Sequence, residues 1–309
     1  MQYGFGVDLG GTTVKIACFE EDGVMQNKWE IPTRLENSGA EILPDIAKSL
    51  QDYCQSHSIT QVLGIGIGVP GAVTDDGVVN RCINLGWGKF NIVQAVGDLT
   101  GFRVVAGNDA TVAALGECRM GGGKGRKNVV MVTLGTGVGG GIVVGGKLIY
   151  GTNGAGGEIG HMVLNRQETI PCNCGKRGCV EQYCSATGIV RMAKDHLANT
   201  QKASALRGKD ITCKDVFDYA AQSDEVAQEV LEQVYSYLGE FIANICCVVD
   251  PEIVVLGGGV SKAGAPLAEG VKRHFIRYAY HPCVDTEFAV ATLGNDAGVY
   301  GAFQMLLDD

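Results

Sequence analysis

Two glutamates, one histidine and three cysteines stand close together in the middle of the sequence. The histidine and the cysteines are residue types that bind metal ions. Three cysteines and a histidine have the composition of a closed Cys₃His zinc site, which stabilises a loop without an open catalytic position. Buried free thiols are the alternative. These cysteines, however, alternate with glycine, asparagine, lysine and arginine, which is not typical of a core. We therefore predict a structural zinc site with the ligands His161, Cys172, Cys174 and Cys179.

The glutamates Glu158 and Glu181 flank these ligands in the sequence. A metal-bound loop would hold both carboxylates in fixed positions. Fixed carboxylates accept hydrogen bonds from the hydroxyl groups of a polyol such as a sugar. The stretch therefore predicts a polyol pocket beside the metal site.

Three glycine-rich turns are candidates for binding phosphate groups. Glycine lets backbone N–H groups approach phosphate oxygens without interference from a Cβ atom. One such turn is usually structural, but three turns, each after an apolar strand-like run, favour a nucleotide. None is a Walker A loop, and Gly135-x-Gly137-x-x-Gly140 precedes a strand pattern, not the helix of a dinucleotide site. The candidate contacts are Gly10, Gly11, Thr12, Thr13, Gly135, Thr136, Gly137, Gly257, Gly258 and Gly259.

Two acidic residues at predicted strand ends could act on such a nucleotide. Asp8 could hold Mg²⁺ through water, with a turn aspartate that caps backbone N–H groups as the equally weighted alternative. Asn108 and Asp109 follow the predicted strand Phe102–Ala106 and suit a helix N-cap. A carboxylate at the C-terminal end of a parallel strand also faces the ligand crevice. There Asp109 could accept a hydroxyl proton, and Asn108 could offer its amide to a sugar.

The elements around these residues alternate between strands and helices, which predicts an α/β fold with parallel sheets. One order occurs twice, at 4–23 and 129–146: an apolar strand, a glycine-threonine turn, a second strand and a hairpin turn. We expect helices to follow, from a capping box of Ser38 and Glu41 in the first half and over 226–245 in the second. The doubled pattern predicts two α/β domains that flank a central cleft.

The domain boundary is expected near 117–125, where a run of glycines interrupts the pattern. The first domain would cover 1–117, and the larger second domain would cover 118–296 with the zinc loop. The last predicted helix would return to the first domain, which 297–309 would complete.

Composition limits the classes of protein. The chain of 309 residues has a net charge of −9 and no long basic cluster, so we expect no nucleic-acid partner. The 12 cysteines without a signal peptide favour thiols and metal over disulfides. No segment predicts a membrane span, so we expect a cytoplasmic protein without a membrane partner. The 46 glycines are expected to gather at strand ends, as phosphate-binding turns require.

Together these motifs resemble the sugar kinases of the ROK group (repressor, open reading frame, kinase) in the actin-like ATPase superfamily. The resemblance covers nearly the whole chain, and its most specific part is the cysteine segment with its trailing glutamate. Within the group, Asn84-Leu85-Gly86-Trp87 and Ser185-Ala186-Thr187-Gly188 are most similar to bacterial ATP-dependent glucokinases. The other matching motifs are Asp8-Leu9-Gly10-Gly11-Thr12, Gly68-Val69-Pro70-Gly71, Asn108-Asp109-Ala110, the glycine run 135–141 and Gly257-Gly258-Gly259-Val260-Ser261.

The resemblance implies two actin-like (ribonuclease H-like) domains and phosphorylation of a hexose 6-hydroxyl by Mg·ATP. Asp109 matches the catalytic base, and His161 would be shared between the zinc site and the sugar loop. Glucose is the first candidate substrate. N-acetylmannosamine, N-acetylglucosamine and fructose are alternatives, because they differ by a few pocket contacts. The matching sugar-binding set is Gly71, Asn84, Asn108, Asp109, Glu158, His161 and Glu181.

One departure from the family pattern concerns the first glycine turn. Many relatives have lysine directly after Gly-Gly-Thr, whereas Thr13 and Val14 precede Lys15 here, so we give Lys15 little weight as a phosphate contact. A sugar-sensing repressor of the same family is the alternative from another class. Repressors need a helix-turn-helix, typically N-terminal, whereas a strand is predicted here from about Tyr3. Relatives are usually dimers or tetramers, which predicts a homo-oligomer.

Overall fold

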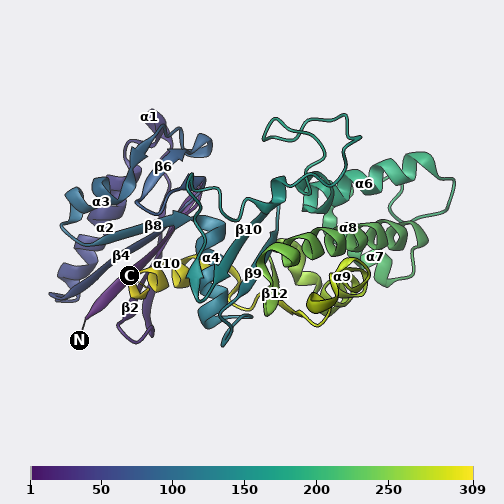
Figure 1. The fold of residues 1–309 in the computed structure, drawn as a ribbon. Coiled ribbons are helices and arrows are strands. Elements are labelled where there is room, and N and C mark those ends of the chain that lie inside the picture. The colour runs from purple at the N-terminus through teal and green to yellow at the C-terminus, as the bar shows by residue number, and fades with distance from the viewer. Residues whose placement is uncertain (1, 309) are drawn as a thin grey trace. The chain divides into compact units, whose positions relative to one another are not determined.

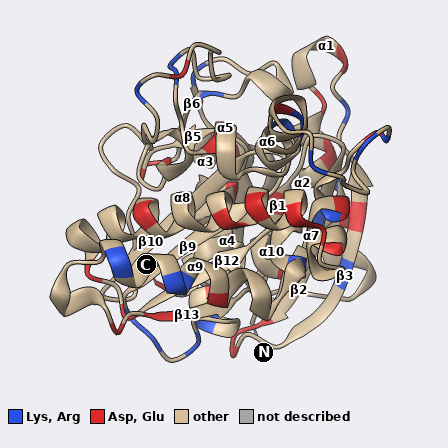
Figure 2. Cartoon of the chain, turned by 90° about the vertical axis from the view of Figure 1, so that its right-hand side faces the viewer, with Lys and Arg blue, Asp and Glu red and all other residues tan. Residues whose placement is uncertain are grey.

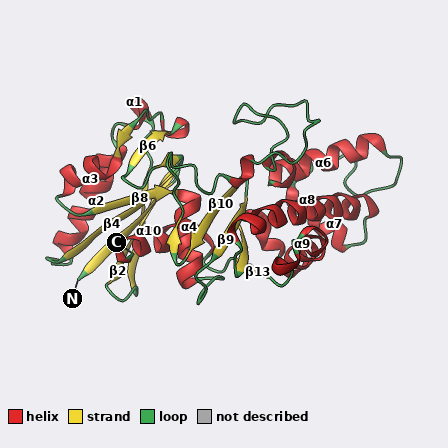
Figure 3. Ribbon diagram, viewed as in Figure 1, coloured by secondary structure: helices red, strands yellow, loops and turns green. Residues whose placement is uncertain are grey.

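The computed structural model describes residues 2–308, which form two compact units (Figure 1). The first unit comprises the chain up to Lys127, the segment Gly141–Gly157 and the chain from Leu293 onward. The second unit comprises Asn128–Gly140 and Glu158–Thr292. Both units contain strands and helices (Figure 3), and the predicted α/β class is confirmed. The central cleft stays a prediction.

A five-stranded sheet in the order β3-β2-β1-β4-β8 is the centre of the first unit. Its first three strands pair antiparallel, whereas β1–β4 and β4–β8 pair parallel. A smaller sheet has the order β5-β6-β7. The bounds are β1 Tyr3–Leu9, β2 Thr13–Glu20, β3 Met25–Pro32, β4 Val62–Val69, β5 Ala72–Val73, β6 Val78–Arg81, β7 Phe90–Asn91 and β8 Val104–Asn108.

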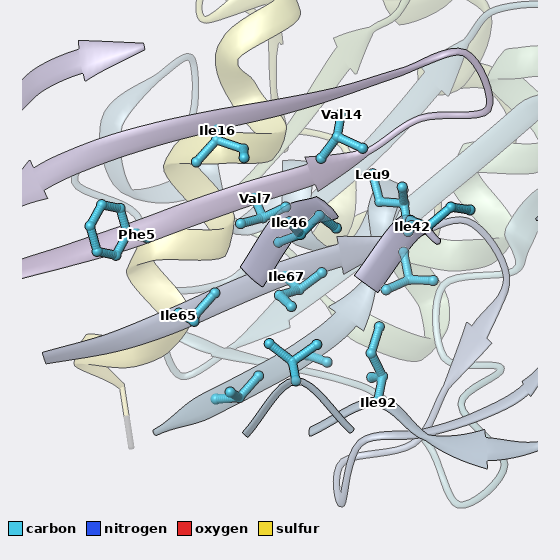
Figure 4. Packing of buried hydrophobic residues seen from close by; sticks show 14 of the residues in the cluster. Phe5, Val7, Leu9, Val14, Ile16, Ile42, Ile46, Ile65, Ile67 and Ile92 are labelled. Atoms are coloured by element: carbon cyan, nitrogen blue, oxygen red, sulfur yellow. The ribbon is translucent and has the colours of Figure 1, made fainter. Parts of the chain in front are cut away.

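Helices cover the central sheet of the first unit. The helices are α1 Glu36–Gly39, α2 Ile42–Ser56, α3 Ile92–Thr100, α4 Asp109–Met120 and α10 Ala297–Leu307. Side chains of β1 and β4, such as Phe5 and Ile67, form a core cluster with Ile46 of α2 and Ile92 of α3 (Figure 4). Other strand residues, such as Phe19, pack instead with α10, which also packs on α4. The C-terminal helix therefore belongs to the core of this unit.

Glycines inside the strands let α10 approach the sheet closely. A Cβ atom at Gly66 of β4 would lie 1.7 Å from the carbonyl oxygen of Ala302, and one at Gly6 of β1 would lie 2.1 Å from that of Val299. Both separations are shorter than any non-bonded contact, so no larger residue fits without a shift of α10. The expectation that glycines gather at strand ends for phosphate turns is therefore only partly right, because helix packing also requires them.

The second sheet has the order β11-β10-β9-β12-β13, in which β12 is parallel to both β9 and β13. Strand β10 begins in the second unit, and its chain enters the first unit at Gly141. The long helix α8 buries the predicted apolar stripe, which includes Val230, Leu238 and Ile245. The bounds are β9 Val129–Leu134, β10 Val138–Val144, β11 Lys147–Leu148, β12 Ile253–Gly257, β13 Glu287–Val290, α5 Glu181–Cys184, α6 Ala186–Asn199, α7 Cys213–Ala221, α8 Glu225–Val249 and α9 Ala265–Tyr278.

The capping box predicted at Ser38 and Glu41 is wrong. Ser38 lies inside the short helix α1 with a left-handed φ of 58°. Helix α2 begins after Glu41, whose side chain makes no capping hydrogen bond. A capping residue needs extended backbone dihedrals, which neither Ser38 nor Glu41 has.

The compact units differ from the expected domain boundaries at three places, residues 118–127, 141–157 and 293–296. Residues up to Lys127 join the first unit because the chain after α4 folds back on it, with the thiol of Cys118 bonding to the carbonyl oxygen of Arg126 at 3.5 Å. Gly141 joins the first unit because it packs on Ala114 of α4. Among residues 2–308, no helix has the length and apolar character needed to span a bilayer. Figure 2 shows lysines and arginines spread over many elements and interspersed with acidic residues.

Candidate active site

Asn108 and Asp109 stand at the junction of β8 and α4 in the first unit. The side-chain oxygen of Asn108 accepts a hydrogen bond from the backbone N–H of Thr111 at 3.1 Å, so Asn108 is the N-cap of α4. Its amide nitrogen donates to the carbonyl oxygen of Gly71 at 3.0 Å. Asp109 is the first helical residue, and its Oδ1 accepts from the N–H of Ala110 at 2.8 Å. Asn108 is therefore the N-cap residue, while the Asp109 carboxylate bonds to the next N–H of the same helix end.

Gly71 and the turn that carries Asn84 belong to the same unit. Gly71 has a φ of 115°, and a Cβ atom there would lie 2.8 Å from the carbonyl oxygen of Arg81, so the position requires glycine. Asn84 is exposed in the turn Ile83–Leu85. Two backbone hydrogen bonds between Cys82 and Trp87 close this turn, at 3.0 and 3.1 Å.

Cys82 is a neighbour of Asp109 that no sequence motif indicated. Its thiol is buried. Burial raises the pKa of Cys82; a backbone hydrogen bond from Leu85 opposes this, and the negative charge of Asp109 adds to it. The electrostatic coupling places the Asp109 carboxylate near this thiol. A lone cysteine beside a turn carries no sequence signal for such a contact, which depends on how β6 and β8 are arranged.

The first glycine turn joins β1 to β2. The N–H of Gly10 donates to the carbonyl oxygen of Thr13 at 3.1 Å, and the hydroxyl of Thr33 donates to the carbonyl oxygen of Gly10 at 2.7 Å. Gly11 and Thr12 at the tip are exposed, and a Cβ atom at Gly11 would meet nothing within 4 Å. The turn is thus fixed at its base and open at its tip, where a ligand can approach the backbone.

Asp8 is the residue before the last one of β1, close to this turn. Its Oδ2 lies 3.7 Å from the ammonium group of Lys15. A Cβ atom at Gly298 of α10 would lie 2.6 Å from the Asp8 carboxyl carbon, so the carboxyl group sits directly over that glycine. Burial raises the pKa of Asp8, and the charge of Lys15 opposes the shift. Asp8 is therefore a partly desolvated carboxylate beside one lysine, Lys15, which suits an acid that binds a further cation.

The second glycine turn, between β9 and β10, is held by the start of α6. The N–H of Gly135 donates to the carbonyl oxygen of Gly137 at 2.9 Å. The hydroxyl of Thr187 donates to the carbonyl oxygen of Thr136 at 2.9 Å, and Ser185 caps α6. Thr187 was part of a family motif, but its contact with this turn could not be read from the sequence, because 51 residues separate the two.

The third glycine turn follows β12 and packs against the second. A Cβ atom at Gly258, where φ is 82°, would lie 2.5 Å from the carbonyl oxygen of Leu134, the residue before Gly135. The hydroxyl of Ser261 donates to the carbonyl oxygen of Gly258 at 2.8 Å. A Cβ atom at Gly259 would meet nothing within 4 Å, so this part of the turn is open. The second and third turns are therefore adjacent within the second unit.

The four predicted metal ligands come together in the second unit. The donor atoms of His161, Cys172, Cys174 and Cys179 all lie within 4.8 Å of one another. The sulfurs of Cys174 and Cys179 are 3.6 Å apart, and the Cys172 sulfur is 3.9 Å from Nδ1 of His161. A tetrahedral zinc ion with Zn–S bonds of about 2.3 Å would hold its ligand atoms about 3.8 Å apart. The donor set and its spacing thus fit zinc.

Two glycines turn the chain between the cysteines. Gly175 and Gly178 have φ angles of 86° and 75°. A Cβ atom at Gly178 would lie 1.8 Å from the carbonyl oxygen of Asn165, so this position requires glycine. Burial opposes the thiolate form of Cys174, but hydrogen bonds from the N–H of Lys176 and from the neighbouring thiols outweigh it and lower its pKa. The surroundings therefore favour the ionised sulfur at Cys174, whereas burial raises the pKa of Cys172 and Cys179.

The two predicted sugar-binding glutamates lie on either side of this cluster. Nε2 of His161 is 4.0 Å from a carboxylate oxygen of Glu158, while its Nδ1 faces Cys172. Glu181 begins α5, and its Oε2 accepts from the N–H of Val138 at 3.1 Å, directly after the second glycine turn. The other oxygen, Oε1, accepts from the thiol of Cys172 at 3.6 Å. Glu181 therefore touches both the metal loop and the second glycine turn.

The predicted site residues fall into two sets. The first unit brings together Asp8 with the first glycine turn, and Asn108 with Asp109 and Gly71, while Asn84 is exposed on a nearby turn. The second unit brings together the metal ligands, the two glutamates and the remaining glycine turns. The two sets do not share a unit, so the structure does not bring Asp109 and Glu181 together within one compact body.

Comparison with known families identifies the class of this chain. The model of the ROK family matches residues 4–309, and the chain belongs to that family. This confirms the resemblance seen in the motifs, and it confirms the actin-like α/β fold, which the solved sugar kinases of the family share.

Individual relatives cover nearly the whole chain. A glucokinase of Halalkalibacterium halodurans is 44% identical over 304 residues, which cover 96% of this chain and 92% of that protein. A ROK hexokinase of Thermus thermophilus superposes with a TM-score of 0.84 at 28% identity, over 99% of this chain and 100% of the other. A ROK glucokinase of Streptomyces griseus, solved in complex with glucose and AMPPNP, superposes with a TM-score of 0.77 at 30% identity, again over 99% and 100%.

Proposed function

We propose that this protein is a glucokinase that transfers the γ-phosphoryl group of ATP to the 6-hydroxyl of glucose. One observation carries the proposal: in a ROK chain similar to glucokinases throughout, a carboxylate that is not the N-cap of its helix stands directly after the end of a parallel strand. That position is where open α/β sheets present groups to ligands.

Asp109 is the proposed general base. Its carboxylate accepts the proton of the sugar hydroxyl as that oxygen forms a bond to the γ-phosphorus and the bond from phosphorus to the bridging oxygen of ADP breaks. The N-terminus of α4 favours the ionised form of this carboxylate. Asn108, fixed by its bonds to Thr111 and Gly71, offers a positioned amide to a neighbouring sugar hydroxyl.

The second unit supplies the remaining sugar contacts in this proposal. Glu158 and Glu181 accept hydrogen bonds from sugar hydroxyls. Because Nδ1 of His161 faces the cysteines and would bind the metal, its Nε2 carries the proton and donates a hydrogen bond to a sugar oxygen. Gly71 and Asn84 complete the proposed set. These polar contacts would orient the hexose, so that the 6-hydroxyl rather than another hydroxyl meets the phosphoryl group.

The glycine turns are the proposed nucleotide contacts. The open tip at Gly11 and Thr12 and the second turn at Gly135–Gly137 offer backbone N–H groups to phosphate oxygens, and the open part of the third turn at Gly259 suits the adenosine. Mg²⁺, when bound with ATP, neutralises charge on the β- and γ-phosphates, and Asp8 would hold its water shell.

Zinc is proposed as a structural ion held by His161, Cys172, Cys174 and Cys179. All four positions of a tetrahedral ion would be filled by protein, which leaves no coordination site for a substrate. Its contribution would be to fix the loop from which His161 and Glu181 reach the sugar. We further propose that the protein is cytoplasmic, forms a homo-oligomer and has no nucleic-acid partner. Light scattering of the purified protein tests the oligomeric state.

A coupled assay of ADP formation against a panel of hexoses tests the proposal. With Mg·ATP as donor, glucose should give the highest kcat/KM among glucose, fructose, N-acetylglucosamine and N-acetylmannosamine. If an N-acetylated sugar or fructose gave the highest kcat/KM, the proposed substrate would be wrong, but the proposed phosphoryl transfer would stand. No turnover with any hexose would leave a sugar-sensing regulator as the better assignment.

A further inference from the structure

Glu168 lies in the loop between His161 and Glu181, which we call the cysteine loop, but it is not a member of the metal cluster. Its carboxylate accepts four hydrogen bonds. Its Oε2 accepts hydrogen bonds from the Tyr183 hydroxyl at 2.6 Å and from Nη1 of Arg191 at 2.8 Å. Its Oε1 accepts from the N–H groups of Thr169 and Ile170 at 2.9 and 3.0 Å. The side chain is only 9% exposed. Four donors thus surround one nearly buried carboxylate.

These bonds keep Glu168 charged over the working range of pH. Burial by itself opposes the charged form, but hydrogen bonds from Tyr183, the Ile170 N–H and Arg191 outweigh it and lower the pKa of Glu168 to about 2. The ion pair is therefore complete at neutral pH. Because both partners are largely shielded from water, the pair is screened by salt much less than an exposed pair.

The partners of Glu168 belong to the helices that follow the loop. Tyr183 is in α5 and Arg191 is in α6, with the guanidinium 4.9 Å from the Tyr183 ring centroid. Nη2 of Arg191 also donates to the carbonyl oxygen of Gln182 at 3.1 Å. Helix α6 also holds the second glycine turn, because the hydroxyl of Thr187 donates to the carbonyl oxygen of Thr136. Glu168 is therefore tied to the same helix that supports a nucleotide-binding turn.

Gln182 fastens both arms of the loop to α5. Its Oε1 accepts from the N–H groups of Gly178 and Cys179 at 2.8 and 3.1 Å. Its Nε2 donates to the carbonyl oxygen of Ile170 at 2.9 Å. The arm before the cysteines and the arm after them therefore meet at one side chain, directly after Glu181.

A metal ion cannot replace these contacts. Its four ligands all belong to the loop and to the segment at His161, so metal bonds shape the loop but attach no part of it to α6. We propose that the Glu168–Arg191 pair is a second, metal-independent anchor that positions Glu181 and His161 for the sugar. We name Glu168, Tyr183 and Arg191 the loop anchor. The role in sugar binding rests on the proposed function; the role in ordering the loop does not.

The first test is Glu168→Gln, which keeps the shape of the side chain and removes its charge. We expect the KM for the sugar to rise about 10- to 100-fold, as when partners that orient ligand side chains are lost. The KM for ATP should stay unchanged, because Thr187 and Ser185 still hold the second glycine turn. Zinc content should also stay unchanged, because all four ligands remain. A merely misfolded fraction would lower kcat without moving either KM.

A double-mutant cycle shows whether the two residues act through each other. Arg191→Gln should raise the sugar KM by a similar factor, and the double variant should be no worse than either single variant. Strictly additive effects would mean that Glu168 and Arg191 act independently, which would overturn the proposal that they form one anchor. Glu225→Gln is the matched control, since this exposed carboxylate of α8 also pairs with a cation, Lys202, but does not contact the loop. It should leave both KM values unchanged.

Hydrogen exchange of zinc-loaded protein tests the anchor without any turnover. Amides of Gly178, Cys179 and Ile170 should exchange faster in Glu168→Gln than in the parent protein, while amides of α8 should not change. Normal exchange at these amides, or an unchanged sugar KM in a folded, zinc-loaded variant, would overturn the anchor. If the parent protein phosphorylates no sugar, the proposed function fails, and the exchange experiment alone decides whether Glu168 and Arg191 order the loop.

Discussion

Two regions of this protein hold candidate catalytic groups in different ways. In the first unit, Asn108 and Asp109 take their positions from the junction of a strand and a helix, where regular hydrogen bonds fix the backbone. In the second unit, His161 and Glu181 stand around an irregular loop, which side-chain contacts and a cluster of metal-ligand side chains hold in shape. The first site should therefore tolerate the loss of any single cross-link, whereas the second should not. Four experiments test this contrast, from the largest expected effect to the smallest.

Asp109→Asn should have the largest effect, and on turnover rather than on structure. We expect kcat to fall by roughly 10²–10⁴-fold, which is the usual contribution of a general base. Sugar affinity measured without turnover and thermal stability should change little, because Asn108, not Asp109, caps α4. Steady-state kinetics and calorimetric titration with glucose measure the two parts. A near-normal kcat in the folded variant would remove Asp109 from the mechanism.

Cys174→Ser should disable the second region while sparing the first. Metal analysis is expected to give about one zinc ion per parent chain and none in the variant. The affinity for glucose should fall by about tenfold or more, because the loop that carries the sugar contacts loses its central cross-link. Cys247→Ser, an exposed cysteine of α8, is the control and should keep both metal and affinity. Full sugar affinity in metal-free Cys174→Ser would show that the loop is organised without the ion.

Gly66→Ala tests how much the first region depends on helix packing. The new Cβ would lie 1.7 Å from the carbonyl oxygen of Ala302, so α10 must shift. Overpacking of this kind costs about 1–3 kcal/mol in the free energy of unfolding, which denaturant titration measures. Gly88→Ala is the control, because a Cβ there meets nothing within 4 Å. Equal stability of the two variants would mean that α10 yields without strain.

Asp8→Asn should have the smallest effect on stability, and a pH-dependent one. Burial raises the pKa of Asp8, so its favourable contribution is present below the unfolded pKa of about 3.9 and is lost as pH rises through the folded value. At neutral pH the variant should therefore melt slightly higher than the parent, by less than about 4 °C. The difference between the two melting temperatures should shrink toward pH 4. The variant should also be less active with Mg·ATP than the parent. A variant that melts lower than the parent at pH 7 would contradict this account.

The sequence predicted local features better than contacts between distant segments. Cys172, Cys174 and Cys179 are separated by few residues, so their spacing alone indicated a cluster. The place of Asp109 followed from the rule that ligands meet the carboxyl ends of parallel strands. Their functional roles stay predictions.

The failures have physical causes. The letters of a capping box occur at Ser38, but the backbone there is left-handed. The anchor between Glu168 and Arg191 joins residues 23 positions apart, and no periodicity encodes such a pair. From composition alone, the glycines of β1 and β4 count among turn residues. The structure shows that Gly6 and Gly66 are needed because α10 approaches the sheet closely at these positions.

That helix has a consequence for synthesis of the protein in the cell. Phe303 and Val299 of α10 cover strands that are translated well before α10 itself. At roughly 5–20 residues per second, the apolar face around Phe19 waits many seconds for its cover while the whole second unit is made. Such a face attracts other nascent chains, so aggregation during translation should depend on how soon α10 arrives. A chain that lacks only its last helix should therefore need chaperones far more than the intact protein does.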